Sequence, residues 1–322
     1  MVAEQLVLCE DWLSGGTMTA ARVRMNELRS SRYAPRTVEA YAMDWADFAG
    51  WCAAAGKTSL PADPETVALY LSHLMPTRKA STLARRVAAI ASKHNAAGIP
   101  APVTPAVRAV LSGARRAKHE RVKQKAAITL DELRTISELL EGEETVRSTR
   151  DRAMILLGFG GAFRRSELAG LGLSDVQLRP DRVTVTLGRT KTDQEGAGRE
   201  LVIPLAKRAM LCPVRALNAW VVERGRWPGP LFCKISRWGD RVVREPIVGD
   251  KVYYALRAAA ERAGLDWRKF GAHSLRAGFV TASADAGADV WDIMATTGHK
   301  SVENLGRYVR RSVARYPLRA VL

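Results

Sequence analysis

The chain has 322 residues, of which 47% are hydrophobic, and a formal net charge of +17 at neutral pH. This length exceeds what one hydrophobic core usually serves, so two domains are expected, and the excess of lysine and arginine indicates nucleic acid as the partner ahead of an anionic membrane. Apolar runs stay below the ~18 residues of a membrane-spanning helix, the N-terminus lacks a signal-peptide pattern, and the four cysteines form no CxxC pair, which argues against structural zinc and a disulfide framework.

The first third of the chain shows helical periodicity. Apolar residues recur at spacings of three and four over 35–55, and a second stripe follows Asp63-Pro64, where proline suits the first turn of a helix. A third helix is expected over 79–97 and a fourth from Thr104-Pro105. These elements predict a helical bundle that occupies residues 1–114.

Basic residues then crowd together between the two expected domains. Six of the eleven residues from Arg115 to Lys125 are lysine or arginine, and Glu120 is the one acid among them. A solvated helix end would also explain such a run. Its position between two folded segments favours an interdomain linker, residues 115–127, which can lie along a phosphate backbone.

The rest of the chain, residues 128–322, predicts a mixed α+β domain. The stretch Thr129–Glu132 has the capping-box pattern of a helix start. Alternating residues over 182–187 and 199–204 predict a small antiparallel hairpin. Helices are expected around this hairpin, at residues 148–160, from 213, and near 249, 272, 289 and 302. The predicted fold is therefore mainly α, with a helical bundle joined to a domain that holds a small antiparallel sheet.

Several basic residues of this domain stand in unusual places. Arg164 follows an apolar segment, where a buried guanidinium needs a partner, and an ion pair with Glu167 would be a purely structural explanation. Lys191 lies at the tip of the expected hairpin, where an ordinary exposed lysine is the alternative. His273 and Arg276 are three residues apart, so a helix can direct both at one ligand. Taken singly, His273 is more simply explained as a core histidine and Arg276 as a cation on a helix surface.

A tyrosine stands at a fixed distance from a second histidine. Gly298-His299 is followed, nine residues after the histidine, by Tyr308. In a strongly basic chain this spacing suggests a phosphate held beside a nucleophile. Tyr308 could instead pack on the last helix, and Tyr316 is a rival candidate for the same role.

The order of these motifs along the chain is informative. Arg164-Arg165-Ser166-Glu167-Leu168, a hairpin lysine, His-x-x-Arg, Gly-His and then a tyrosine resembles the tyrosine recombinase (phage integrase) family, most closely its Cre-type site-specific members. The resemblance extends over the whole chain and implies a SAM-like core-binding domain before the catalytic domain. Two local departures from the family pattern are visible. Gly161-Ala162 stands where the family often has the Thr-Gly of Thr-Gly-x-Arg, and Thr297 replaces the leucine of Leu-Gly-His. Neither departure removes a reactive group.

The resemblance implies a role for each reactive residue. Tyr308 would attack the scissile phosphorus, which gives a 3′-phosphotyrosine and a free 5′-hydroxyl. Arg164 and Arg276 would bind the non-bridging oxygens, because a planar guanidinium binds phosphate at two points and stays charged. Each well-aimed donor is worth on the order of 3–4 kcal/mol in such a transition state.

The remaining roles concern protons and orientation. Lys191 would protonate the departing 5′-oxygen, and His273 would act in proton transfer. His299 would hydrogen-bond a phosphate oxygen, and Glu167 would orient the site by holding His273 or an arginine. Neither a metal nor a cofactor is implied, since the covalent intermediate conserves the phosphodiester energy and the sequence lacks a P-loop and a carboxylate cluster.

DNA recognition is expected mainly from the N-terminal bundle. Arg85 and Arg86 are the candidates for base-edge contacts, since arginine bound to guanine is the commonest specific contact, although phosphate contacts are the alternative for both. The other candidates for DNA contact are Arg36, Lys79, Ser81, Thr82, Lys93, Lys118, Arg121, Lys123 and Arg189.

These features together predict a site-specific DNA recombinase that works through a Holliday junction. Its expected partners are double-stranded DNA with inverted-repeat target sites and three further copies of the chain. The C-terminal segment 316–322 would dock into a neighbouring copy, with a frayed tail as the alternative. A bacterial, phage or plasmid protein of the cytoplasm is expected, without a membrane. The competing interpretations are a type IB topoisomerase-like enzyme and a catalytically silent DNA-binding regulator of the same fold.

Overall fold

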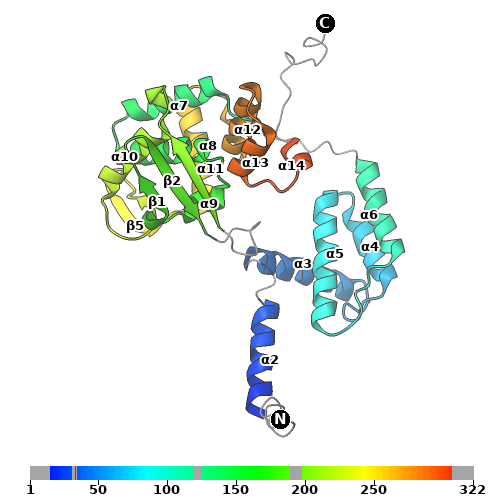
Figure 1. Cartoon of the computed structure of the whole chain (residues 1–322). Coiled ribbons are helices and arrows are strands. Elements are labelled where there is room, and N and C mark those ends of the chain that lie inside the picture. The colour runs from blue at the N-terminus through cyan, green and yellow to red at the C-terminus, as the bar shows by residue number, and fades with distance from the viewer. Residues whose placement is uncertain (1–14, 31–32, 34, 119–124, 189–197, 307–322) are drawn as a thin grey trace. The chain divides into compact units, whose positions relative to one another are not determined.

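The chain divides into two compact units, residues 1–122 and 123–322 (Figure 1). The computed structural model describes residues 15–30, 33, 35–118, 125–188 and 198–306. Within these ranges, no helix is long and apolar enough to cross a membrane.

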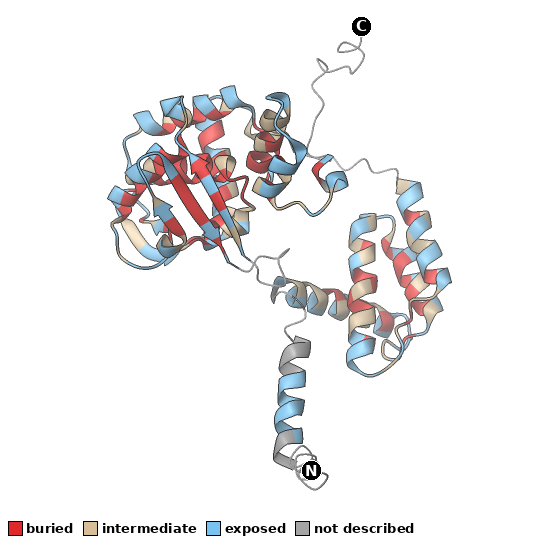
Figure 2. Ribbon diagram, in the orientation of Figure 1, coloured by how far each residue is buried: buried red, intermediate tan, exposed pale blue. Residues whose placement is uncertain are grey.

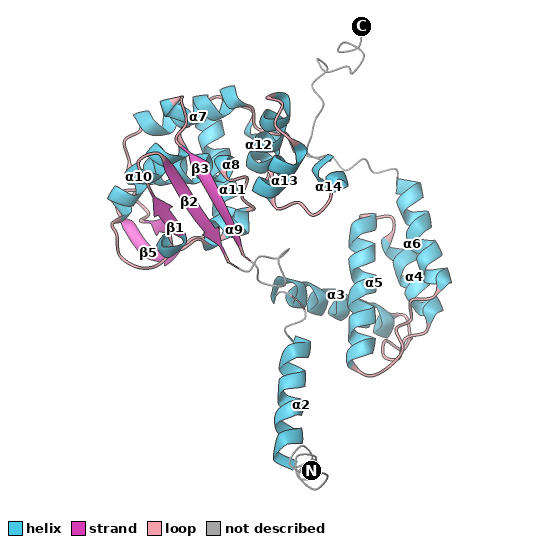
Figure 3. Ribbon diagram, in the orientation of Figure 1, coloured by secondary structure: helices cyan, strands magenta, loops and turns pink. Residues whose placement is uncertain are grey.

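The first unit is built from helices (Figure 3). They are α2 (Gly15–Ser30), α3 (Pro35–Ala54), α4 (Pro64–Leu74), α5 (Ala80–Ala96) and α6 (Pro105–Lys118). Four of them were predicted, and Asp63 caps α4 by accepting a hydrogen bond from the Thr66 amide at 2.7 Å. Helix α2 was not predicted; within its residues 18–25, for which burial is described, the side chains of Met18, Val23 and Met25 are exposed.

The core of this unit lies between α3, α4, α5 and α6. Its buried residues include Phe48, Tyr70, Leu83 and Ile90. Helix α6 continues to Lys118, so the first residues of the segment expected as a linker are helical.

The second unit is mainly helical and contains two small sheets. Its helices are α7 (Leu130–Gly142), α8 (Val146–Gly160), α9 (Arg165–Gly170), α10 (Pro213–Arg224), α11 (Gly249–Arg262), α12 (Ser274–Asp285), α13 (Val290–Thr297) and α14 (Val302–Gly306). Its strands are β1 (Val176–Leu178), β2 (Arg182–Leu187), β3 (Arg199–Pro204), β4 (Cys233–Ile235) and β5 (Val242–Pro246). The predicted mainly helical fold with a small antiparallel sheet is therefore confirmed.

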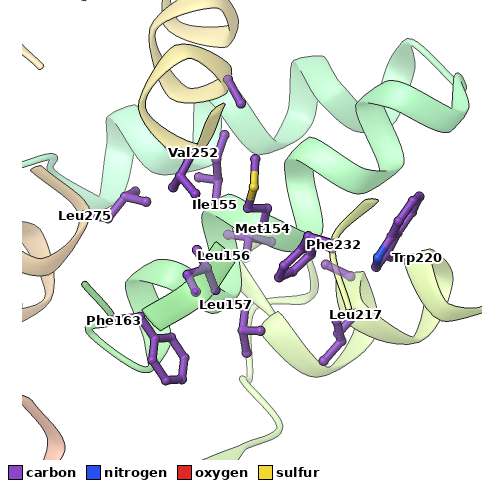
Figure 4. Packing of buried hydrophobic residues seen from close by; sticks show 14 of the residues in the cluster. Met154, Ile155, Leu156, Leu157, Phe163, Leu217, Trp220, Phe232, Val252 and Leu275 are labelled. Atoms are coloured by element: carbon purple, nitrogen blue, oxygen red, sulfur yellow. The ribbon is translucent and has the colours of Figure 1, made fainter. Parts of the chain in front are cut away.

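Helix α8 is the central element of this unit. It packs against α7, α10, α11 and α12, and residues 151–158 are all buried (Figure 2). Leu156 and Leu157 lie in one cluster with Trp220 and Phe232 (Figure 4). Because α8 ends at Gly160, this packed helix fixes the position of the loop that leads to Arg164.

The three-stranded sheet is antiparallel in the order β1-β2-β3. Val183 pairs with Ile203, Val185 with Leu201, and Leu187 with Arg199. Side chains alternate across a strand, so Arg199 lies on the same face as the buried Leu201 and Ile203. The predicted hairpin is confirmed at both strands. Strand β1 and the β4–β5 pair were not predicted; β1 and β4 have three residues each and are too short to show alternation.

Helix α12 lies close to the start of the second unit. The amide of Ile128 donates to the carbonyl of Ser274 at 3.2 Å. At Gly278 a Cβ atom would collide with the Ile128 carbonyl oxygen and lie 3.0 Å from a ring carbon of Phe159. Glycine at this position therefore allows α12 to approach the residues beneath it.

Candidate active site

Arg276 is held in place by two main-chain carbonyls. The side chain lies in the first turn of α12 and only 2% of its residue surface is exposed. Its Nη1 donates to the carbonyl of Ala162 at 2.8 Å, and its Nη2 donates to the carbonyl of Thr297 at 2.5 Å. Since these carbonyls belong to the loop before α9 and to the end of α13, the guanidinium joins three segments that lie far apart in sequence.

Ala162 occupies an unusual backbone conformation. Its φ is 48°, in the left-handed region, and its methyl group is fully buried. Such a conformation costs a residue with a Cβ atom about 1–2 kcal/mol, and glycine adopts it without that penalty. This geometry gives a physical reason for glycine in the family pattern at this position. Here an alanine keeps its carbonyl directed at Arg276 despite the strain.

Arg164 and Glu167 form one unit at the start of α9. The guanidinium Nη1 donates to Oε1 of Glu167 at 2.5 Å, and the amide of Arg164 donates to Oε2 of the same carboxylate at 2.9 Å. The sequence left open whether Glu167 holds a histidine or an arginine. In the structure both carboxylate oxygens bind Arg164.

His299 lies beside Arg276 at the end of α13. The Nη2 of Arg276 is 3.3 Å from its Nε2, and the hydroxyl of Thr297 is 2.7 Å from its Nδ1. Gly298 ends the helix in the left-handed conformation, with φ at 67°. Burial, followed by the charges of Arg276, Arg164 and Arg199, lowers the pKa of His299 to about 4. The imidazole is therefore neutral at physiological pH.

His273 stands at the N-cap of α12. Its carbonyl accepts a hydrogen bond from the amide of Ala277 at 2.8 Å, and the residue is exposed. Partial burial, followed by the charges of Arg276, Arg165 and Arg164, lowers its pKa below the usual value. The same two arginines, Arg164 and Arg276, therefore influence both histidines, which places the four predicted side chains in one electrostatic cluster.

Arg199 is a member of this cluster that was not predicted. Its Nη1 donates to the carbonyl of Thr296 at 2.7 Å, and burial lowers the pKa of its guanidinium, with Glu167 and Arg164 as its charged neighbours. The sequence contains a signal for it, because the alternation of β3 places position 199 on the inner face with Leu201. A charged residue at an inward position needs a partner or a function.

The cluster has the chemistry of a phosphate site. Three guanidinium groups lie around a neutral imidazole, and guanidinium groups bind phosphate oxygens at two points. In the parts of the chain that the structure describes, no group of three or more histidine, cysteine or carboxylate side chains could hold a metal ion. The predicted lysine and nucleophile, Lys191 and Tyr308, lie outside the described residues, as do Arg189 and Tyr316.

The structure separates the two arginines that were chosen as base readers. Arg86 is 6% exposed, and its guanidinium binds the Asp47 carboxylate and the Tyr70 hydroxyl. Bonding to Arg86 is the main cause that lowers the pKa of Asp47. Position 86 lies three residues after Leu83 and four before Ile90, so it belongs to the core stripe of α5. The expectation that Arg86 contacts bases is therefore corrected: its place is inside the bundle.

Arg85 lies on the surface of α5. Its side chain is 51% exposed and binds Asp44 on α3 through Nε at 2.8 Å and Nη2 at 3.1 Å. It remains a candidate for DNA contact. The other candidates within the described bundle are exposed or half-buried, and they are Arg36, Lys79, Ser81, Thr82, Lys93 and Lys118. Arg121 and Lys123 lie outside the described residues.

A helical bundle followed by an α+β unit with clustered arginines and histidines is the architecture of a tyrosine recombinase. Residues 127–315 match the Phage integrase family, and residues 25–97 match the Phage integrase N-terminal SAM-like domain. The chain therefore belongs to the phage integrase family and is an enzyme of the tyrosine recombinase class.

Individual relatives cover most of the chain. It is 39% identical over 304 residues to an integrase/recombinase XerD homolog of Selenomonas ruminantium, which corresponds to 90% of this chain and 88% of that protein. It is 24% identical over 282 residues to the Cre recombinase of Escherichia phage P1, with 82% and 80% covered. A lambda integrase tetramer bound to a Holliday junction has the same fold, with a TM-score of 0.60, 17% identity, and 93% of this chain and 80% of that chain covered.

Proposed function

We propose that the chain exchanges DNA strands at specific sites through a covalent 3′-phosphotyrosine on Tyr308 and a Holliday junction. The observation that carries this proposal is one cluster of arginines and histidines. The guanidinium of Arg276 lies beside the ring of His299, and the charge of Arg164 lowers the pKa of both His273 and His299. A scissile phosphate bound there would place its non-bridging oxygens against the two guanidinium groups. Negative charge that develops on these oxygens would meet donors already oriented by the protein, which is the largest common contribution to such catalysis.

The remaining steps follow from the same chemistry. The hydroxyl of Tyr308 attacks phosphorus, and the 5′-oxygen leaves with a proton from Lys191. His273 moves the proton of the attacking tyrosine, which its lowered pKa favours by keeping the imidazole neutral. The 5′-hydroxyl of a partner strand then attacks the phosphotyrosine and restores the tyrosine. Each step exchanges one phosphodiester for another, so no external energy source is required.

The assembly proposed is a homotetramer on two DNA sites with inverted repeats. The structure of a related lambda integrase is a tetramer bound to a Holliday junction, and the net charge of +17 suits a chain that wraps DNA. The bundle would contribute Arg85 and Lys93 of α5, with Lys79 at the start of that helix. The C-terminal segment 316–322 would join neighbouring copies.

A nicked suicide substrate tests the chemistry. We expect the full chain to form a denaturation-resistant adduct with a nicked duplex carrying its target site, because the departing strand diffuses away and traps the intermediate. The adduct should be absent in Tyr308→Phe and retained in Tyr316→Phe. An adduct that persists in Tyr308→Phe would refute the assignment of the nucleophile. Relaxation of a plasmid without a target site would instead indicate a topoisomerase.

Two further measurements test the assembly. Deletion of residues 317–322 should weaken pairing of two DNA sites more than binding to one site, and equal loss of both would contradict the docking role. Affinity for a single site should fall steeply with salt, since each neutralised phosphate releases counterions. An affinity that stays constant between low and moderate salt would contradict the proposal that lysine and arginine side chains bind the DNA phosphates.

A further inference from the structure

We propose that Thr297 is a positioning residue that decides which ring nitrogen of His299 carries the proton. The proposal deepens the function proposed for this site and rests on it, because the proton on Nε2 is the one that can reach a phosphate oxygen. Thr297 is one of the two departures from the family pattern, since leucine, which has no hydroxyl, is usual before Gly-His.

The hydroxyl of Thr297 lies within hydrogen-bond distance of a ring nitrogen and of a main-chain carbonyl. The residue is fully buried, and its Oγ1 is 2.7 Å from Nδ1 of His299 and 2.7 Å from the carbonyl of Ile293. A hydroxyl has one proton and two lone pairs. It can therefore donate to the carbonyl and accept from the ring, or donate to the ring.

The neighbours of His299 select between these two arrangements. In the first arrangement Nδ1–H donates to Thr297, the hydroxyl donates to Ile293, and Nε2 accepts from the Arg276 guanidinium at 3.3 Å. Every proton then has an acceptor, so this arrangement suits the DNA-free protein. In the second arrangement the hydroxyl donates to Nδ1, and the ring proton moves to Nε2.

A phosphate oxygen beside Arg276 would favour the second arrangement. The oxygen would take over the guanidinium donor and would offer an acceptor to Nε2–H. The low pKa of His299 makes the alternative, a doubly protonated ring, costly at neutral pH. Rotation of one threonine hydroxyl would thus let a neutral histidine donate to phosphate. A leucine at this position would leave Nδ1 without this partner.

A purely structural explanation predicts different behaviour. Threonine in a helix commonly bonds to the carbonyl four residues earlier, and the bond to Ile293 alone would only finish the last turn of α13. In that case the effect of losing the hydroxyl would not depend on the presence of His299. The two explanations are therefore separable by a double-mutant cycle.

The kinetic test uses single-turnover cleavage of the nicked duplex by the full chain. We expect Thr297→Val to slow adduct formation about 10-fold, in line with the loss of one hydrogen bond, and Thr297→Ser to stay within about 2-fold. In a His299→Ala background, Thr297→Val should cause no additional slowing. An equal slowing in both backgrounds would overturn the proposal.

The second test needs no catalysis. With ¹⁵N-labelled histidine, the DNA-free protein should show the Nδ1–H tautomer for His299, assigned by its loss in His299→Ala among the five histidines. Thr297→Ser should keep this tautomer, and Thr297→Val should shift it towards Nε2–H. An Nε2–H ring in the wild-type protein, or an unchanged ring in Thr297→Val, would overturn the proposal. If the wild-type chain formed no adduct, the proposed function would fail, and this spectrum would still decide the role of Thr297.

Discussion

The neutral state of His299 predicts a specific dependence of stability on pH. The pKa of this histidine is about 4 in the folded chain, because the ring is half-buried beside Arg276, Arg164 and Arg199. In the unfolded chain it is about 6.5. The unfolded state therefore binds more protons between these values, so stability rises with pH in this window and is lost as pH falls through it.

The size of the effect follows from the two pKa values. One unit of difference between the folded and unfolded pKa values is worth about 1.36 kcal/mol, so the full loss of stability below pH 4 is about 3 kcal/mol. Between pH 7.5 and pH 5.0 the same linkage gives a loss of about 2 kcal/mol. Other groups also titrate between these pH values. The contribution of His299 is the difference between the loss of the wild-type chain and the loss of a variant whose residue 299 does not titrate.

The assay is urea unfolding at both pH values. We expect His299→Gln to lose about 2 kcal/mol less than the wild type between pH 7.5 and 5.0. The control is His73→Gln, because that side chain is exposed on α4 in the other unit, and it should lose as much as the wild type. If the wild type and His299→Gln lost equal stability, the ring would be neither buried nor held among cations as described.

Three further predictions concern the packing of α12 and the placement of arginines. Gly278→Ala should destabilise the second unit by about 2 kcal/mol in urea unfolding, because overpacking outweighs the gain in helix propensity. The control Gly142→Ala should not destabilise it, because a Cβ atom there would have no neighbour within 4 Å. Arg86→Ala should lower the thermal midpoint of the first unit, and Arg85→Ala should weaken DNA binding in a gel shift. Loss of stability in Arg85→Ala together with weakened DNA binding by a stable Arg86→Ala would contradict their placement. Arg199→Met should slow cleavage about 10-fold and raise the pKa of His299, because one nearby cation is lost. The pKa is measured by NMR titration, and an unchanged value would refute the place of Arg199 in the cluster.

Much of the fold could be predicted, because its signals are local. The capping box of Thr129 and Glu132 marks the start of α7, and both of its reciprocal hydrogen bonds are present. Alternation over 182–187 predicts β2 with the correct bounds. Such features depend on the residue and its near neighbours, so one sequence is enough to find them.

Other elements depend on partners that are distant in sequence. Strands β1 and β4 have three residues each, and β4 is defined only by its pairing with β5 across a turn. The left-handed backbone at Ala162 is difficult to predict from sequence, because its carbonyl bonds to the guanidinium of Arg276, more than one hundred residues later.

Buried arginines were the hardest residues to interpret, and their partners distinguish them. Arg86 binds a carboxylate and a tyrosine hydroxyl, so its charge is used inside the bundle. Arg276 and Arg199 instead donate to main-chain carbonyls. A carbonyl oxygen orients a guanidinium but carries no net charge that would neutralise it. Arg276 and Arg199 are therefore costly for the fold, and we propose that they serve to bind a phosphate at a strand-transfer site.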